Sequence, residues 1–81
     1  MSHQTGFIRI EYTGRLSEEL REYLAGVRGV EATSVQPLVL RTAVPDRLLG
    51  AIMPYLRGAA MQVERIQLRN PGFEHVEVNA A

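Results

Sequence analysis

Apolar and polar residues alternate along three stretches of the chain, which span residues 7–12, 38–44 and 62–69. Such alternation is typical of a strand with one buried face, because successive side chains point to opposite sides of a sheet. The pattern therefore predicts three half-buried strands. Their expected inward-facing residues are Ile8, Ile10, Tyr12, Leu38, Leu40, Val44, Ile66 and Leu68.

A fourth, shorter strand is expected over residues 30–36, where Val30 and Val35 are apolar and small residues lie between them. Because this stretch has little apolar surface to bury, it suits the edge of a sheet. Pro37 has no backbone N–H to donate to a neighbouring strand. We therefore expect a hairpin turn or a bulge near Gln36 and Pro37.

An amphipathic helix is expected after the first strand, because apolar residues recur there with helical spacing. Its apolar stripe consists of Leu16, Leu20, Tyr23, Leu24 and Val27. Ser17 and Thr13 are the candidate N-caps, since a hydroxyl can accept from the first free backbone N–H groups. Gly26 and Gly29 are expected to end the helix.

A second helix is expected after the third strand. Its apolar stripe consists of Leu48, Leu49, Ile52, Met53 and Leu56. Asp46 is the expected N-cap, and Gly58 is expected to end the element. Pro54 lies inside the stripe, where proline removes one helical hydrogen bond and clashes with the preceding turn. The sequence therefore predicts a kink or a change of helix axis near Pro54.

The two strand–helix units are copies of one another. Residues 39–59 align with residues 7–27 at an offset of 32, with six identical positions. The identical pairs are Arg9/Arg41, Arg15/Arg47, Leu16/Leu48, Tyr23/Tyr55, Leu24/Leu56 and Gly26/Gly58. Each copy is followed by a second short strand, so the chain reads as two βαβ units.

Two consecutive βαβ units predict a ferredoxin-like βαββαβ sandwich of the α+β class. We expect a four-stranded antiparallel sheet with the spatial order 4-1-3-2 and with both helices on one face. One ferredoxin-like domain is expected over residues 7–78. Residues 1–6 are interpreted as a disordered tail or the remnant of a tag, and residues 79–81 as a disordered tail.

Charge and composition exclude several classes of partner and chemistry. Arginines and acidic residues number nine each, so the formal net charge is zero and no nucleic-acid partner is expected. The chain has no cysteine, which excludes disulfides and cysteine-ligated metal sites. No apolar run approaches the roughly 18 residues of a membrane span, and no signal peptide is visible. We therefore expect a cytoplasmic protein without direct membrane insertion.

No constellation of side chains indicates an enzyme. Acylphosphatases share the expected fold, but they need an arginine in a glycine-rich first loop and an asparagine that places water. Here that loop reads Tyr12-Thr13-Gly14-Arg15, and no asparagine lies near the expected strand. His75 between Glu74 and Glu77 resembles a metal site only weakly, since a single histidine among acids is more often a surface residue. We expect no catalytic residues, no metal and no cofactor.

The candidate interaction site is the sheet face opposite the helices. Its expected residues are Phe7, Arg9, Glu11, Arg41, Arg65 and Arg69. An aromatic side chain among arginines on such a face can bind single-stranded RNA. Because only one aromatic is present and the net charge is zero, a solvated or protein-contact face is the preferred interpretation.

The residues after the turn signal Asn70-Pro71-Gly72 form a second candidate contact. The apolar positions of this tail are Phe73, Val76 and Val78. A free tail would expose these side chains to water, which is unfavourable. We therefore expect the tail to pack or pair against another surface.

From Phe7 to Val78 the chain resembles the accessory domain that follows the nucleotide-binding domain in exporter-type ABC transporter ATPases. The turn at residues 27–31 resembles a "pGV" turn of that family, and residues 63–69 resemble its last core strand. The family's final stretch reads like "v-r-x-P-s-L-E-D-V-F". Its Pro, Leu, Glu and Val correspond here to Pro71, Phe73, Glu74 and Val76. The chain departs from the pattern at His75 and Glu77, where the family has Asp and Phe.

The resemblance implies a domain that does not hydrolyse ATP. It would modulate or dimerise the ATPase at the inner face of the membrane, with an ABC ATPase domain or a transporter subunit as its partner. The sheet face or the tail would make the contact. Two alternatives remain open: an ACT-like module that senses a small ligand as a homodimer, and a single-strand RNA binder.

Overall fold

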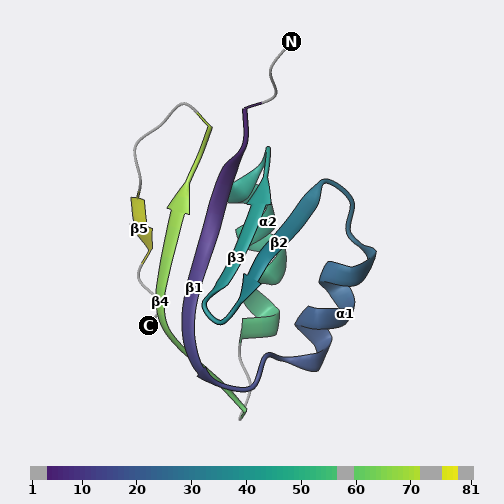
Figure 1. Ribbon diagram of the computed structural model, residues 1–81, viewed down its shortest axis with the longest axis vertical. Helices are drawn as coiled ribbons and strands as arrows, with labels where there is room; N and C mark the ends of the chain where they lie inside the picture. Colours follow the sequence, from purple (N-terminus) through teal and green to yellow (C-terminus); the bar gives the residue numbers. More distant parts are fainter. Residues whose placement is uncertain (1–3, 57–59, 72–75, 79–81) are drawn as a thin grey trace.

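The computed structural model describes residues 4–56, 60–71 and 76–78. Strands and helices follow one another in the order expected from the duplicated sequence, with one additional strand at the end (Figure 1). The elements are β1 (Gly6–Gly14), α1 (Glu18–Gly26), β2 (Val30–Val35), β3 (Leu38–Thr42), α2 (Pro45–Ile52), the 3-10 helix η1 (Met53–Leu56), β4 (Met61–Arg69) and β5 (Val76–Val78).

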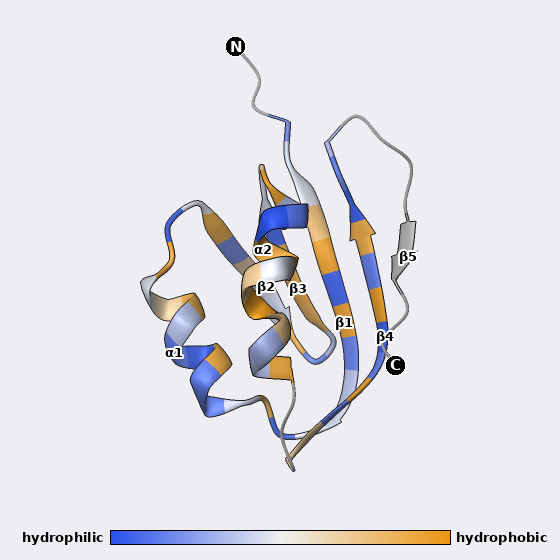
Figure 2. Ribbon diagram, turned by 180° about the vertical axis from the view of Figure 1, so that it is seen from behind, coloured by the Kyte–Doolittle hydropathy of each residue, from blue (hydrophilic) through white to orange (hydrophobic). Residues whose placement is uncertain are grey.

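All five strands form one antiparallel sheet in the order β2-β3-β1-β4-β5. Counted from the β4 side, the first four strands in the chain follow one another as 4-1-3-2. The sheet differs from the expected four-stranded one because β5 adds outside β4, so β4 is not an edge strand. Both helices lie on the same face of the sheet (Figure 2). This α+β architecture is consistent with the ferredoxin-like class.

The duplication is visible in the packing as an approximate two-fold relation. Ile8 and Leu40 are equivalent positions of the two copies, and they lie directly opposite one another in the β1–β3 pair. In the helix layer the equivalent residues Tyr23 and Tyr55 have ring centroids 5.5 Å apart. An approximate two-fold axis therefore runs through the middle of the sheet and between the two helical segments.

The expected inward-facing residues form the core, with one exception. Ile8, Ile10 and Leu40 are completely buried, and the others are also buried except Val44, whose side chain is 50% exposed. The prediction for Val44 was wrong because β3 ends at Thr42. Thr42 takes the inward position in its place, and its Oγ1 accepts a hydrogen bond of 3.2 Å from the backbone N–H of Val44.

Strand β4 departs from simple alternation. The register between β1 and β4 shifts between Glu11 and Tyr12, so β4 carries one extra residue at this point. Such a bulge moves the inward face of a strand by one position. Met61 and Val63 consequently face the core before the bulge, whereas Ile66 and Leu68 do so after it. The pattern over residues 62–69 predicted a regular strand and did not reveal this shift.

Helix α1 is shorter than its apolar stripe. Ser17 is the N-cap, and its Oγ accepts a hydrogen bond of 3.4 Å from the N–H of Leu20. The helix ends at Gly26, while Leu16 and Val27 lie just outside it. Of the residues in α1, Leu20 alone is fully buried.

Helix α2 begins without a side-chain cap. Val44 occupies the N-cap position and Pro45 the first turn, so the prediction of Asp46 as the N-cap was wrong. Asp46 lies in the first turn, where its carboxylate accepts a hydrogen bond of 2.9 Å from Asn70 Nδ2. Proline suits this position because its missing N–H would have no helical partner there.

Near Pro54, where a kink or a change of helix axis was expected, the helix changes from α to 3-10 geometry. The α-helix ends at Ile52, and the chain continues as the 3-10 turn η1, which contains Pro54. This change rotates the side chains, so Leu56 remains buried whereas Met53, expected in the buried stripe, is 38% exposed. Residue 58, the expected end of this element, lies outside the described residues.

Candidate functional site

The sheet face opposite the helices is not covered by any other described element (Figures 1 and 2). We call it the open face. In β1 the residues between the buried positions point to this side, and their cross-strand partners share it. All six predicted interaction residues lie on the open face, namely Phe7, Arg9, Glu11, Arg41, Arg65 and Arg69. Their role in binding stays a prediction.

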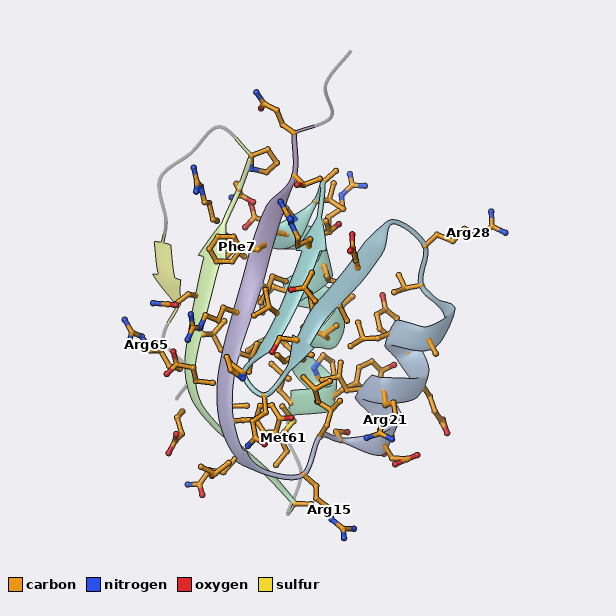
Figure 3. All side chains as sticks on the ribbon, viewed as in Figure 1. Phe7, Arg15, Arg21, Arg28, Met61 and Arg65 are labelled. Carbon is orange, nitrogen blue, oxygen red and sulfur yellow. The ribbon has the colours of Figure 1, made fainter. Side chains whose placement is uncertain are left out.

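The strand register arranges these residues in rows across the sheet. One row runs Glu31, Arg41, Phe7, Arg69, and the next runs Ser34, Val39, Arg9, Gln67. Glu11 and Arg65 form a third pair. Figure 3 shows the Phe7 ring beside β4 and the Arg65 side chain extending on the β4 side of the sheet. The open face is therefore a mixture of guanidinium groups, carboxylates and a few apolar side chains.

One guanidinium of the open face is neutralised within its own strand. Arg9 Nε lies 3.4 Å from Glu11 Oε2, and the two side chains are 45% and 35% exposed. Ion pairs this exposed contribute at most about 1 kcal/mol to stability. The pair therefore matters mainly because it lowers the net charge around Arg9.

Arg41 and Arg69 differ from Arg9, which forms an ion pair with Glu11. Both are exposed, and among the described residues neither forms an ion pair with a carboxylate. The register places each of them directly beside Phe7, one on β3 and one on β4. Phe7 itself is half-buried. This arrangement of two exposed cations around one aromatic residue was not evident from the sequence, because it depends on the pairing register.

Two hollows lie at opposite ends of the sheet. One of about 310 Å³ is lined by Arg9, Glu11, Tyr12, Gln36, Pro37 and Glu64. The other, of about 360 Å³, is lined by Thr5, Gly29, Val30, Glu31, Arg41 and Thr42. Neither lining contains a cysteine, histidine, serine or lysine that could act as an activated nucleophile or a neutral-pH base. Both linings are mostly polar or charged.

Beside the first hollow, two hydrogen bonds connect β1 to the end of β2 and to the β2–β3 turn. The Tyr12 hydroxyl donates to the carbonyl of Val35 at 2.8 Å. The side-chain amide of Gln36 donates to the carbonyl of Tyr12 at 3.2 Å. These bonds connect the expected turn at Gln36 and Pro37 to the central strand of the sheet.

Searches against protein-family models, curated proteins and solved structures found no match for this chain.

The tail was expected to pack or pair, and part of it pairs. The backbone of β5 pairs with β4, so that Val76 lies opposite Leu68 and Val78 opposite Ile66. Phe73, together with the metal-like residue His75, lies outside the described residues. The alternation of Val76 and Val78 was the only sequence signal for a fifth strand, and three residues are too few to distinguish a strand from a packed tail.

The described part of the chain lacks two further features. No helix there has the length and apolar character needed to cross a membrane. The same residues contain no group of three or more histidine, cysteine or acidic side chains arranged to hold a metal ion.

Proposed function

We propose that this chain is a ferredoxin-like, non-catalytic interaction module, and that its open face binds the ATPase domain of an exporter-type ABC transporter. The observation that carries the proposal is the one-sided architecture. Both helices cover one face of the sheet, while the other face presents arginines around Phe7 and Val39. Arginine and aromatic residues are enriched in protein interfaces, which supports a protein partner.

The size of the open face is also compatible with this role. Five strands spaced about 4.8 Å apart give a width of about 24 Å, and about six residues of each strand give a length of about 20 Å. A partner could thus bury about 500 Å² on this side, or about 1,000 Å² in total. Contacts between domains of one chain and transient contacts between proteins have areas of this order.

The choice of an ABC ATPase as partner depends on the resemblance. Two features of the structure agree with it without testing it. Gly29, in the turn that resembles the family's "pGV" sequence, has φ of +77°, a conformation that favours glycine. The stretch that resembles the family's final motif connects β4 to β5, where the chain returns to pair with the sheet.

The proposal is tested with a protein from the same cell that carries a GxxxxGK[ST] phosphate-binding loop and an exporter-type ATPase sequence. This ATPase would be purified alone and with the full chain, and binding and the rate of ATP hydrolysis would be measured. We expect a specific complex with an altered hydrolysis rate, and no hydrolysis by the chain alone.

Two matched variants locate the contact. Replacement of Arg9 and Arg41 by glutamate reverses charge on the open face, and we expect it to weaken the complex at least tenfold. Arg21→Glu makes the same kind of change on α1, away from this face, and should leave binding unchanged (Figure 3). Equal binding by the open-face variant and by wild type would contradict the proposed contact.

A further inference from the structure

Because the chain has an approximate two-fold relation, Arg9 and Arg41 can be compared directly, and they differ in the carboxylates near them. These arginines occupy equivalent positions of the two copies. Each lies opposite an apolar residue of the other central strand, Arg9 opposite Val39 and Arg41 opposite Phe7. Local backbone and neighbouring apolar contacts are thus similar at the two sites.

The carboxylate that follows Arg9 by two residues has no counterpart two residues after Arg41. The position equivalent to Glu11 is Ala43, which follows the end of β3 at Thr42. Glu31 lies opposite Arg41 across the β2–β3 pair, but no ion pair connects these two described residues. Among the described residues, neither Arg41 nor Arg69, on the other side of Phe7, forms an ion pair with a carboxylate.

The spacing of Arg41 and Arg69 indicates the shape of a complementary partner. Arg41 and Arg69 lie in one row on β3 and β4, two strand spacings apart, which places their Cα atoms about 10 Å from each other. Residues i and i+7 of an α-helix are separated by about 10.5 Å along its axis and lie on one side of it. A helix lying across the strands could therefore bring one carboxylate to each arginine and an apolar side chain to the surface between them.

We infer that the Arg41–Phe7–Arg69 row binds an acidic amphipathic helix of the partner protein, with carboxylates at i and i+7 and an apolar residue at i+3 or i+4. Arginine can form two parallel hydrogen bonds with a carboxylate, so each charged contact is directional as well as attractive. The inference builds on the proposed function in using the same face, but it does not require the partner to be an ATPase.

A second copy of this chain does not supply such a helix. The acidic residues of α1 are Glu18, Glu19 and Glu22, and seven residues beyond them lie Ala25, Gly26 and Gly29. In α2 the only acid is Asp46, and Met53 lies seven residues further on. The described helices of the chain therefore lack the required pair of carboxylates, and the occupant is a different protein.

The test uses two synthetic helical peptides that are identical except at positions i and i+7, which are glutamate in one and lysine in the other, with leucine at i+3 and i+4. Binding to the full chain would be followed by fluorescence anisotropy, and the contact would be mapped by changes in backbone amide NMR signals. We expect the glutamate peptide to bind, with the largest signal changes at Phe7, Arg41 and Arg69. The lysine peptide should bind at least tenfold more weakly.

Variants then test the two arginines directly. Arg41→Gln combined with Arg69→Gln should raise the Kd of the glutamate peptide at least tenfold, whereas Arg21→Gln on α1 should not change it. Because the three side chains are exposed, the variants should remain folded, which thermal unfolding would verify. Equal affinity for both peptides, unchanged affinity in the double variant, or no binding at about 1 mM peptide would overturn the inference.

A single-stranded oligouridylate serves as the competing probe. If it binds the Arg41–Phe7–Arg69 row more tightly than the glutamate peptide does, the occupant is nucleic acid and the inference is wrong. Failure here can be distinguished from failure of the proposed function. If the peptide does not bind but the double variant Arg9→Glu, Arg41→Glu still disrupts the ATPase complex, the helix inference is wrong and the proposed function stands.

Discussion

Helices α1 and α2 come from equivalent parts of the duplicated sequence, yet they contribute differently to the core. Helix α2 approaches β1, β3 and β4 and buries Pro45, Leu48 and Ile52. Helix α1 approaches η1 and buries Leu20 alone. Figure 2 shows α2 over the middle of the sheet and α1 beside it.

The difference follows from where each helix crosses the sheet. Helix α1 connects β1 to the edge strand β2, beyond which the sheet stops. Helix α2 connects β3 to β4, and the sheet continues past β4 with β5. In η1, which follows α2, Leu56 is buried, whereas its equivalent Leu24 in α1 is only partly buried. Similar sequences thus acquire different roles from their position in the sheet.

The largest effect is expected when one completely buried side chain is removed from each helix. Ile52 and Leu20 are equivalent positions, and both are completely buried. Replacement of either by alanine should lower the free energy of unfolding by about 2 to 5 kcal/mol. We expect Ile52→Ala to destabilise the whole domain, because Ile52 belongs to the helix that lies over the central strands.

Leu20→Ala should act more locally. It removes the only fully buried side chain of α1, so amide hydrogen exchange of α1 should accelerate while β1 and β3 remain protected. Chemical denaturation and hydrogen exchange on both variants provide the measurement. Uniform loss of protection in Leu20→Ala would show that α1 and the sheet unfold as one unit.

A smaller effect is expected from the cap that distinguishes α1 from α2. Ser17→Ala should lower the free energy of unfolding by about 1 kcal/mol or less, since the Ser17–Leu20 hydrogen bond is long at 3.4 Å. Ser17→Asp is the matched control, because a carboxylate can accept the same bond and suits the positive end of the helix. Thermal unfolding would compare the three proteins, and equal loss in both variants would argue against a capping role.

The smallest expected change stabilises α2. Gly50 is exposed within this helix, and a Cβ there would meet no atom within 4 Å. Gly50→Ala should therefore raise the free energy of unfolding by about 0.5 to 1 kcal/mol, because alanine loses less backbone freedom on folding.

A contrasting control for Gly50 is Gly14→Ala. Gly14 has φ of +90°, and a Cβ would collide with the carbonyl oxygen of Ala60, so this change should be clearly destabilising. Both variants can be compared in one denaturation series. If Gly50→Ala does not stabilise the protein, helix propensity does not limit the stability of α2.

Much of the fold could be predicted because the alternation and the repeat are strong local signals. Inward residues such as Ile8 and Leu40 follow from that alternation alone. The errors at Val44, Asp46 and Met53 share a cause, since each depends on where a strand or helix ends, and competing caps and turns decide this. The bulge in β4 could not be predicted because it is a property of the pairing with β1.

The sequence was enough to predict which residues belong to the candidate site, but not how they are arranged on the sheet. Period-two alternation was enough to place Arg9 and Arg41 on one face. It could not show that Arg69 joins Arg41 in a row around Phe7, because the offset between neighbouring strands is set by long-range pairing.

The central position of β1 also has a consequence for the order of events during synthesis. Both hydrogen-bonded neighbours of β1 come from the second βαβ unit of the chain, with Phe7 paired to Arg41 and to Arg69. On the ribosome β1 is made before either neighbour, so Ile8 and Ile10 remain accessible to water and to chaperones until β3 emerges. The first copy of the repeat cannot complete its core alone, and folding must wait for loops of about 30 residues to close.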